Sequence, residues 1–167
     1  MNLHIAPWNQ SPGGRERQSY GCFGGEIVRI LAVDHGEKRI GVAISDPTGT
    51  IASPLKVIKH TSRVIDAAQI AELALQNGVE LVLIGQSFDE QGQPNPAGRR
   101  AERFAETLKT QTQIPILLWD ESFSTQEARR ARIDIGVRRK KRSGHLDELA
   151  ATVILQSYLE ANRGHQQ

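Results

Sequence analysis

Three acidic residues that could take part in catalysis or ligand binding stand directly after apolar segments of the chain. Asp34 follows the apolar segment 27–33, and Asp120 and Glu121 follow the segment 114–119. Acidic residues are poor strand formers, and sites in open α/β sheets lie beyond the carboxyl ends of strands. These positions therefore indicate a site at a sheet edge. Taken singly, each acid also fits an ordinary turn, because Asp favours turns.

A further acid, Asp147, stands on a segment with helical periodicity. It shares a predicted helix face with Ala150, Ile154 and Tyr158 through steps of three and four residues. A carboxylate on a core-facing stripe is costly unless it is paired or binds a metal. The small Ala150 and Ala151 would let this helix approach the sheet closely. The alternative is an acid in the first helical turn, where the helix dipole favours it.

We expect Asp34, Glu121 and Asp147 to form one catalytic site that binds metal. Hard oxygen ligands suit Mg²⁺ or Mn²⁺, and two such ions about 4 Å apart can promote hydrolysis of a phosphodiester. The five His do not have the spacing of a zinc motif. Asp120 would replace Glu121 if the strand register were shifted by one residue, because such a shift exchanges the faces.

Positive charge is concentrated in one segment of the chain. Residues 129–142 hold eight Lys or Arg and one acid, whereas the rest holds 13 basic and 18 acidic residues. This pattern is typical of a contact with a phosphate backbone, although a solvated helix end and loop would look the same. The residues expected to bind nucleic acid are Lys38, Arg39, Arg138, Arg139, Lys140, Lys141 and Arg142.

The composition fits one globular domain. The chain has 167 residues, a hydrophobic fraction of 38% and a net charge of +2. No apolar stretch approaches the roughly 18 residues that span a bilayer, and no secretory signal is present, so we expect a cytoplasmic protein without a membrane partner. The single Cys22 excludes an internal disulfide. We interpret residues 1–25 as a flexible, disordered leader and 26–162 as the domain.

The first half of the domain predicts three strands and a helix. The strands are expected at 27–33, 39–45 and 55–58, with a turn at Asp34-His35-Gly36 after the first. A helix capped by Thr61 or Ser62 would follow and end at Asn77-Gly78. Its expected apolar stripe is Val64, Ala68, Ala71 and Leu75.

The second half predicts alternating strands and helices. Strands are expected at 79–85 and 114–119, separated by a polar loop over 86–98 and a helix with Ala97, Ala101, Phe104 and Leu108 on one face. Ser124 and Glu127 form a capping-box pattern for a helix that ends near Gly136. A last helix is expected over 144–159. The order indicates an α/β fold, with a mixed sheet and helices on both faces.

At natural spacing, the chain resembles the YqgF/RuvX family from about residue 30 to 159. The opening match runs from Asp34-x-Gly36 to Ala43, and the later ones include Trp119-Asp120-Glu121 and the residues after Asp147. The matching segments are 34–43, 45–47, 119–121, 124–125, 139–142, 147–151 and 154–159.

The resemblance implies a ribonuclease-H-like fold with a five-stranded mixed sheet, similar to RuvC-type Holliday-junction resolvases. It also implies that Asp34, Glu121 and Asp147 are catalytic, and that the activity is trimming of the 5′ end of pre-16S rRNA. The chain departs from the family pattern at three places. His35 stands where Pro is usual, Gln86-Ser87 replace Leu-Pro, and Ser122 replaces an Arg whose role Arg99 or Arg129 would have to take over.

Three functions stay open at this point. The first is a nuclease that cuts structured RNA, and the second is a resolvase that cuts branched DNA. A resolvase would act as a homodimer because it cuts two strands symmetrically, whereas an RNA nuclease can be a monomer. The third is a non-catalytic nucleic-acid-binding or transcription factor. The presence of all three carboxylates argues against it. A sugar-kinase-like ATPase needs two copies of this fold, which 167 residues cannot hold.

Overall fold

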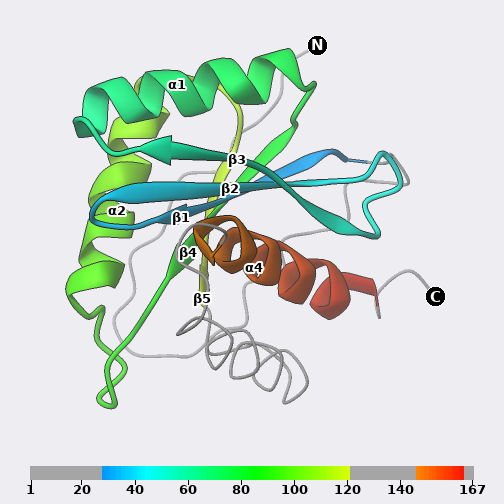
Figure 1. Cartoon of the computed structure of the whole chain (residues 1–167). Coiled ribbons are helices and arrows are strands. Elements are labelled where there is room, and N and C mark those ends of the chain that lie inside the picture. The colour runs from blue at the N-terminus through cyan, green and yellow to red at the C-terminus, as the bar shows by residue number, and fades with distance from the viewer. Residues whose placement is uncertain (1–27, 121–145, 164–167) are drawn as a thin grey trace, which may run out of the picture.

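The computed structural model describes residues 28–120 and 146–163, and Figure 1 shows the arrangement of their helices and strands. A five-stranded sheet has the order β3-β2-β1-β4-β5. Strands β1 and β2 are antiparallel, as are β2 and β3, whereas β4 runs parallel to β1 and β5 parallel to β4. The predicted five-stranded mixed sheet is confirmed. The strands are β1 (Ile30–His35), β2 (Arg39–Ser45), β3 (Ala52–Lys59), β4 (Leu81–Gln86) and β5 (Ile116–Asp120).

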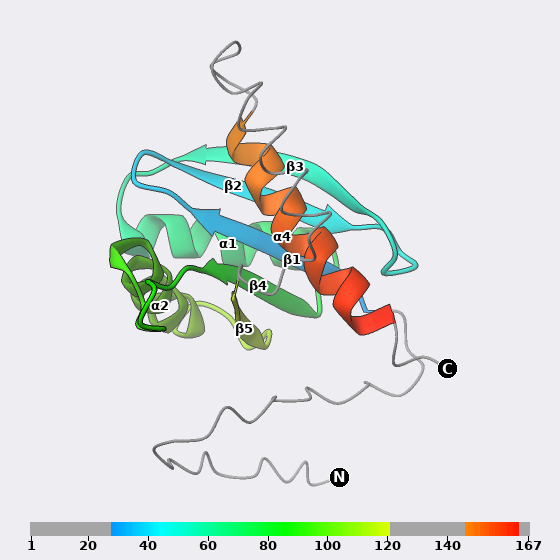
Figure 2. The same ribbon diagram turned by 90° about the horizontal axis from the view of Figure 1, so that it is seen from below.

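Helices cover both faces of the sheet, as predicted. In the described residues, α1 (Arg63–Gln76) and α2 (Pro96–Lys109) lie on one face and α4 (Leu146–Arg163) on the other (Figures 1 and 2). None of these helices is long and apolar enough to cross a membrane. The expected leader over 1–25, the helix after Ser124 and the whole basic segment 129–142 lie outside the described residues.

The two faces of the sheet carry two separate cores, because side chains alternate along each strand. Leu31 and Val33 of β1 pack with α1 and α2, whereas Ile30 and Ala32 pack with α4. The central strands β1 and β4 are buried on both faces, which is why their sequences are almost continuously apolar. The edge strand β3 is mostly exposed and accommodates Pro54, which has no N–H to donate.

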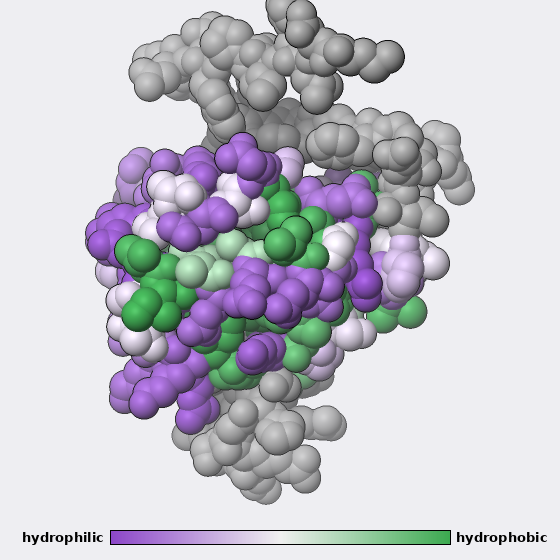
Figure 3. Space-filling view, turned by 90° about the horizontal axis from the view of Figure 1, so that it is seen from above, coloured by the Kyte–Doolittle hydropathy of each residue, from purple (hydrophilic) through white to green (hydrophobic). Residues whose placement is uncertain are grey.

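Helix α1 packs on a different stripe from the one predicted. Of the predicted stripe, Val64, Ala68 and Leu75 are exposed, and Ala71 is half-buried and packs against the core. The buried residues of the helix are Ala67, Ile70 and Ala74, together with Asp66. The helix is turned so that the apolar stripe includes the buried first-turn acid Asp66. Figure 3, which views the α1 side of the molecule, shows separate apolar patches among hydrophilic residues. The observed cap is Ser62, whose hydroxyl accepts a hydrogen bond from Ile65 N.

Helix α2 begins at Pro96, inside the segment 86–98 that was predicted to be a polar loop. Asn95 accepts a hydrogen bond from Gly98 N, and Pro96 follows it. Ala101, Phe104 and Leu108 are buried as expected. The prediction for Ala97 was wrong, because it is exposed while Gly98 packs against the loop; a Cβ there would lie 2.2 Å from Ser87 O.

The last helix, α4, packs across the sheet and contacts β1, β2, β3 and β4. Figure 2 shows α4 lying across the sheet. Its residues Ile154, Leu155 and Leu159 are buried together with residues of β1, β2 and β4. At the end of β5, Trp119 Nε1 donates a hydrogen bond of 3.0 Å to Ser157 Oγ. The Trp119 ring also meets Tyr158 edge to face. This contact fixes the end of β5 against α4.

Candidate active site at the carboxyl ends of the central strands

Asp34 belongs to the last part of β1 rather than to a turn after it. The strand runs on through His35, so its end differs from the prediction by two residues. The cause is the antiparallel pairing with β2, in which Asp34 faces Gly41 and His35 faces Ile40. Asp34 continues the alternation of Ile30 and Ala32, so its half-buried side chain lies on the face that α4 covers.

Glycines flank Asp34 on both neighbouring strands. On β2, Asp34 pairs with Gly41. On β4, Ile84 pairs with Val33, so the next residue, Gly85, lies beside Asp34. Neither neighbour presents a side chain to the Asp34 carboxylate. A strand glycine often marks a place where a ligand or another backbone approaches closely. The two glycines therefore mark Asp34 as a candidate position for binding an ion or a phosphate.

Asp120 lies on the other face of the sheet from Asp34. It ends β5 opposite Gln86, and Gln86 Nε2 donates a 2.7 Å hydrogen bond to Glu102 Oε1 of α2. Trp119, one residue earlier, packs on the α4 face. This register disfavours Asp120 as the partner of Asp34, which leaves the predicted role with Glu121.

The other predicted carboxylates are only partly placed. Asp147 lies in the first turn of α4, the helix that covers the Asp34 face, but its side chain is outside the described part. Glu121 and the basic residues 138–142 are outside it as well. The convergence of the three carboxylates thus stays a prediction. The structure describes the side chain of Asp34 and the backbone of Asp147.

The turn after β1 brings two of the predicted cations to the surface. Lys38 and Arg39 are exposed at the β1–β2 hairpin. Gly36 shapes this turn, because its N–H is 3.1 Å from both Asp34 O and Arg39 O and an added Cβ would lie 2.5 Å from Arg39 O. The glycine therefore allows the chain's own Arg39 carbonyl to approach closely at this turn.

The segment after β4 binds α2 through the residues that depart from the family pattern. Gln86 pairs with Glu102, and Ser87 Oγ donates to Asn95 Oδ1 over 2.9 Å. Arg99 was one of two candidates to replace the arginine that the family usually has at the position of Ser122. It donates from Nη1 to Pro94 O over 2.6 Å. This hydrogen bond directs Arg99 to its own loop, so the structure gives it no role beside Asp34.

Sequence reasoning missed a group of ionisable residues on the opposite face. His35 comes from β1, His60 from the segment after β3 and Asp66 from α1, and ligand atoms of all three lie within 4.8 Å of one another. Burial lowers the pKa of His35, which favours the neutral imidazole. No regular spacing joins these residues, and the only signal was the unusual His after Asp34.

The chemistry of the Asp34 site fits an oxygen-seeking divalent cation. The half-buried carboxylate of Asp34, with Gly41 opposite it on β2, offers the hard oxygen atoms that such an ion prefers. The imidazoles of His35 and His60 lie on the other face of the sheet, where His35 packs against Phe104. The expected type of ion, Mg²⁺ or Mn²⁺, is therefore compatible with the part of the site that the structure describes.

The fold is that of the RuvC-like members of the ribonuclease H class. Thermus thermophilus RuvC, solved in complex with a Holliday junction substrate, superposes with a TM-score of 0.55 at 15% identity, covering 82% of this chain and 96% of that chain. A second structure of Thermus thermophilus RuvC gives a TM-score of 0.56 at 14% identity, with 82% and 97% covered. At these identities the likeness concerns the fold.

The family follows from closer sequence relatives. The model of the RuvX family, described as Holliday junction resolvase, matches residues 28–161. A proposed pre-16S rRNA nuclease of Thermoanaerobacter pseudethanolicus is 41% identical over 137 residues, which are 81% of this chain and 99% of the relative. The relative of the same description in Bacillus cytotoxicus is 39% identical over 136 residues, covering 80% and 99%. The chain belongs to the RuvX family and is a nuclease, an enzyme that hydrolyses phosphodiester bonds of nucleic acid.

Proposed function

We propose that this nuclease processes the 5′ end of pre-16S rRNA in the cytoplasm, with Asp34, Glu121 and Asp147 as the residues that hold its metal ions. The relatives that are about 40% identical over almost their whole length are described as acting on this precursor. The positions of the acids in the sequence support the same kind of site, because Asp34 and Glu121 follow apolar segments and Asp147 lies on a helix.

The observation that carries the proposal is the position of Asp34. It lies near the carboxyl end of the central strand β1, between Gly41 and Gly85, on the face that α4 covers. Strands held on both sides by hydrogen bonds are rigid, so the carboxylate has a fixed place. Helix α4, which covers this face, contains Asp147 in its first turn, and this supports Asp147 as the second ligand of the proposed site.

Each part of the chain has a distinct task in this proposal. Mg²⁺ or Mn²⁺ bound by the carboxylates would supply an activated water and neutralise charge on the scissile phosphate. Asp34 holds its oxygen atoms at the sheet edge, where the flanking glycines admit the phosphate. Lys38 and Arg39, exposed on the hairpin, contact the backbone of the RNA, and the basic residues 138–142 extend that contact.

Junction resolution is the second candidate, because the matching family model is described as Holliday junction resolvase. The two functions differ in the required assembly. A resolvase that cuts two strands symmetrically needs two active sites, so it would act as a dimer, whereas trimming of one RNA end needs only one.

The test offers both substrates to the purified full-length chain. A 16S precursor with its 5′ extension and a four-way DNA junction are each incubated with Mn²⁺, with a chelator as control, while light scattering gives the mass in solution. We expect a shortened 5′ end that requires Mn²⁺. Symmetric cleavage of the junction by a dimer, without cleavage of the precursor, would favour the resolvase. Binding of both substrates without any cleavage would mean a non-catalytic protein.

A further inference from the structure

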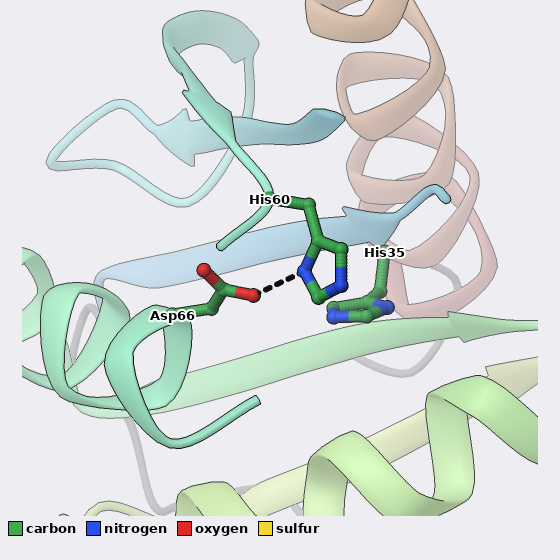
Figure 4. A group of neighbouring side chains, drawn as sticks. All are labelled: His35, His60 and Asp66. Atoms are coloured by element: carbon green, nitrogen blue, oxygen red, sulfur yellow. Dashed lines mark hydrogen bonds and ion pairs between the residues drawn. The ribbon is translucent and has the colours of Figure 1, made fainter. Parts of the chain in front are cut away.

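Three side chains with metal-binding chemistry converge on the face opposite Asp34, as Figure 4 shows. His35 comes from the end of β1, His60 follows β3, and Asp66 lies in the first turn of α1. Each contributes a ligand atom, and these atoms all lie within 4.8 Å of one another. Two imidazoles and one carboxylate from three elements thus surround one point.

His35 lacks the contacts that a buried histidine normally has. Its residue is 8% exposed, and neither ring nitrogen has a hydrogen-bond partner in the described part of the chain. The ring lies between Phe104, with centroids 4.4 Å apart, and His60, with centroids 5.6 Å apart. Buried side-chain nitrogens are almost always satisfied, so unpaired ones suggest a ligand.

Asp66 is a carboxylate with no solvent exposure. Its oxygens accept a 3.1 Å hydrogen bond from Thr61 N and lie 2.5 Å from Nδ1 of His60. A buried negative charge needs a compensating positive charge or several hydrogen bonds. A cation bound by Asp66 and the two histidines would satisfy the carboxylate and the unpaired His35 ring together.

We propose that His35, His60 and Asp66 bind a divalent transition metal, Zn²⁺ in the first place. Imidazole nitrogen with carboxylate oxygen suits Zn²⁺ and its neighbours in the first transition row, whereas Mg²⁺ prefers oxygen alone. Ligands at about 2.0–2.2 Å from a tetrahedral ion lie roughly 3.4 Å from each other. Movements of the order of an ångström convert the observed arrangement into that geometry. The His60 side chain, 32% exposed, leaves a path from solvent.

This metal site is separate from the proposed nuclease site. Its ligand His35 follows Asp34 directly, but the two side chains project to opposite faces of β1. A metal held here connects the end of β1 to the end of β3 and the start of α1. It therefore acts as a clamp that fixes the backbone of the strand carrying Asp34, and it takes no part in the hydrolysis.

The test uses the full chain with Asp34→Asn, so that metal bound at the nuclease carboxylates is reduced. Co²⁺ serves as the spectroscopic probe and Zn²⁺ as the competitor. We expect one equivalent of Co²⁺ with the intense visible absorption of a low-coordinate site with nitrogen ligands, and its loss when Zn²⁺ is added. Weak absorption typical of six oxygen ligands, or no binding, would overturn the proposal without affecting the nuclease assignment.

Three variants locate the site in the chain. His35→Phe keeps an aromatic ring against Phe104 while removing both nitrogens, and His60→Gln removes the second imidazole. Each should weaken Zn²⁺ binding by more than the roughly 10–100-fold that loss of an outer-shell partner costs. His165→Gln, a histidine outside the group, is the matched control and should bind as the parent does. Equal Zn²⁺ affinity in His35→Phe and the parent would place the metal elsewhere.

A stability measurement keeps the test independent of how well the variants fold. Zn²⁺ should raise the unfolding temperature of the full chain with Asp34→Asn, which is the parent of these variants. A ligand that binds only the native state stabilises it. Folded His35→Phe, checked by circular dichroism, should show no such increase. An equal increase in both proteins would contradict the proposal.

Discussion

Asp34 and His35 are consecutive residues of β1 whose side chains lie on opposite faces of the sheet. Asp34 follows Ile30 and Ala32 toward α4, whereas His35 follows Leu31 and Val33 toward Phe104 of α2. One strand end therefore presents a carboxylate to one side and an imidazole to the other. The two sides can be tested by different substitutions, because each change leaves the other face in place.

The first prediction compares two identical substitutions on opposite faces. Asp34→Asn should lower metal-dependent cleavage of the 16S precursor by more than about 100-fold, because loss of a metal ligand exceeds the effect of an outer-shell change. Asp120→Asn should retain most of the activity, since Asp120 lies on the α2 side. The measurement is initial cleavage rate with Mn²⁺. Greater loss in Asp120→Asn than in Asp34→Asn would mean that β5 contributes Asp120 to the site.

The second prediction concerns the hairpin turn after β1. Gly36→Ala should destabilise the protein by about 1–3 kcal/mol, because the new Cβ would lie 2.5 Å from Arg39 O and the backbone must move. Urea unfolding gives the free energy. Gly78→Asn is the control, at a left-handed position with open space that Asn tolerates, and should change the free energy of unfolding by less than about 0.5 kcal/mol. Equal effects would contradict the crowding argument.

The third prediction tests the buried stripe of α1. Ile70→Ala should cost about 2–5 kcal/mol of unfolding free energy, because Ile70 is fully buried in the core with α2. Leu75→Ala should cost no more than about 0.5 kcal/mol, since Leu75 is 77% exposed. Thermal and urea unfolding of the two variants compare them directly. A larger loss of unfolding free energy in Leu75→Ala than in Ile70→Ala would mean that the stripe containing Leu75 faces the core.

The fourth prediction is a pH effect at the β2–β3 turn. Hydrogen bonds from the backbone of Ile51 first, with Thr48 and Thr50, hold the pKa of Asp46 well below its usual range. The stabilisation from a lowered carboxyl pKa is fully present above the unfolded value near about 4 and is lost as the pH falls toward the folded value. Asp46→Asn should therefore flatten the acid side of the curve of stability against pH.

The control for this pH effect weakens the same turn less. Thr48→Ala removes one hydroxyl donor to Asp46 and leaves the backbone donors, so its curve should lie between those of the parent and Asp46→Asn. Unfolding temperatures from about pH 2 to pH 6 give the curves. If the unfolding temperatures of the parent and of Asp46→Asn fell equally as the pH was lowered, the turn hydrogen bonds would not favour the ionised carboxylate.

The strands could be predicted because a buried strand has a run of apolar residues that is visible in the local sequence. Segments such as 81–84, buried on both faces, are continuously apolar. The start of α2 was not predicted, because Asn95 and Pro96 lie in a polar segment that looked like a loop. The stripe of α1 could not be settled in this way. Two sets of apolar residues fit a helical period, and the set that faces the core lies beside Asp66, a buried acid that contacts His60 and Thr61.

The candidate site was predictable only as a set of acids at element ends. The position of Asp34 after an apolar run pointed to the sheet edge, but which face it occupies depends on strand register, which spacing alone does not fix. The group of His35, His60 and Asp66 has no motif, because its members come from elements brought together by the β1–β2–β3 meander and the turn into α1. Tertiary contact, not sequence spacing, defines it.

The hydrogen bond from Trp119 to Ser157 gives the molecule a built-in optical reporter. The indole lies in the junction of β5 and α4, so its fluorescence emission should shift toward longer wavelength whenever this helix separates from the sheet and water reaches the ring. Replacing Trp8, the other tryptophan, with Phe leaves Trp119 as the single emitter. Stopped-flow traces of that variant would then time the docking of the element that carries Asp147, separately from the chemistry of cleavage.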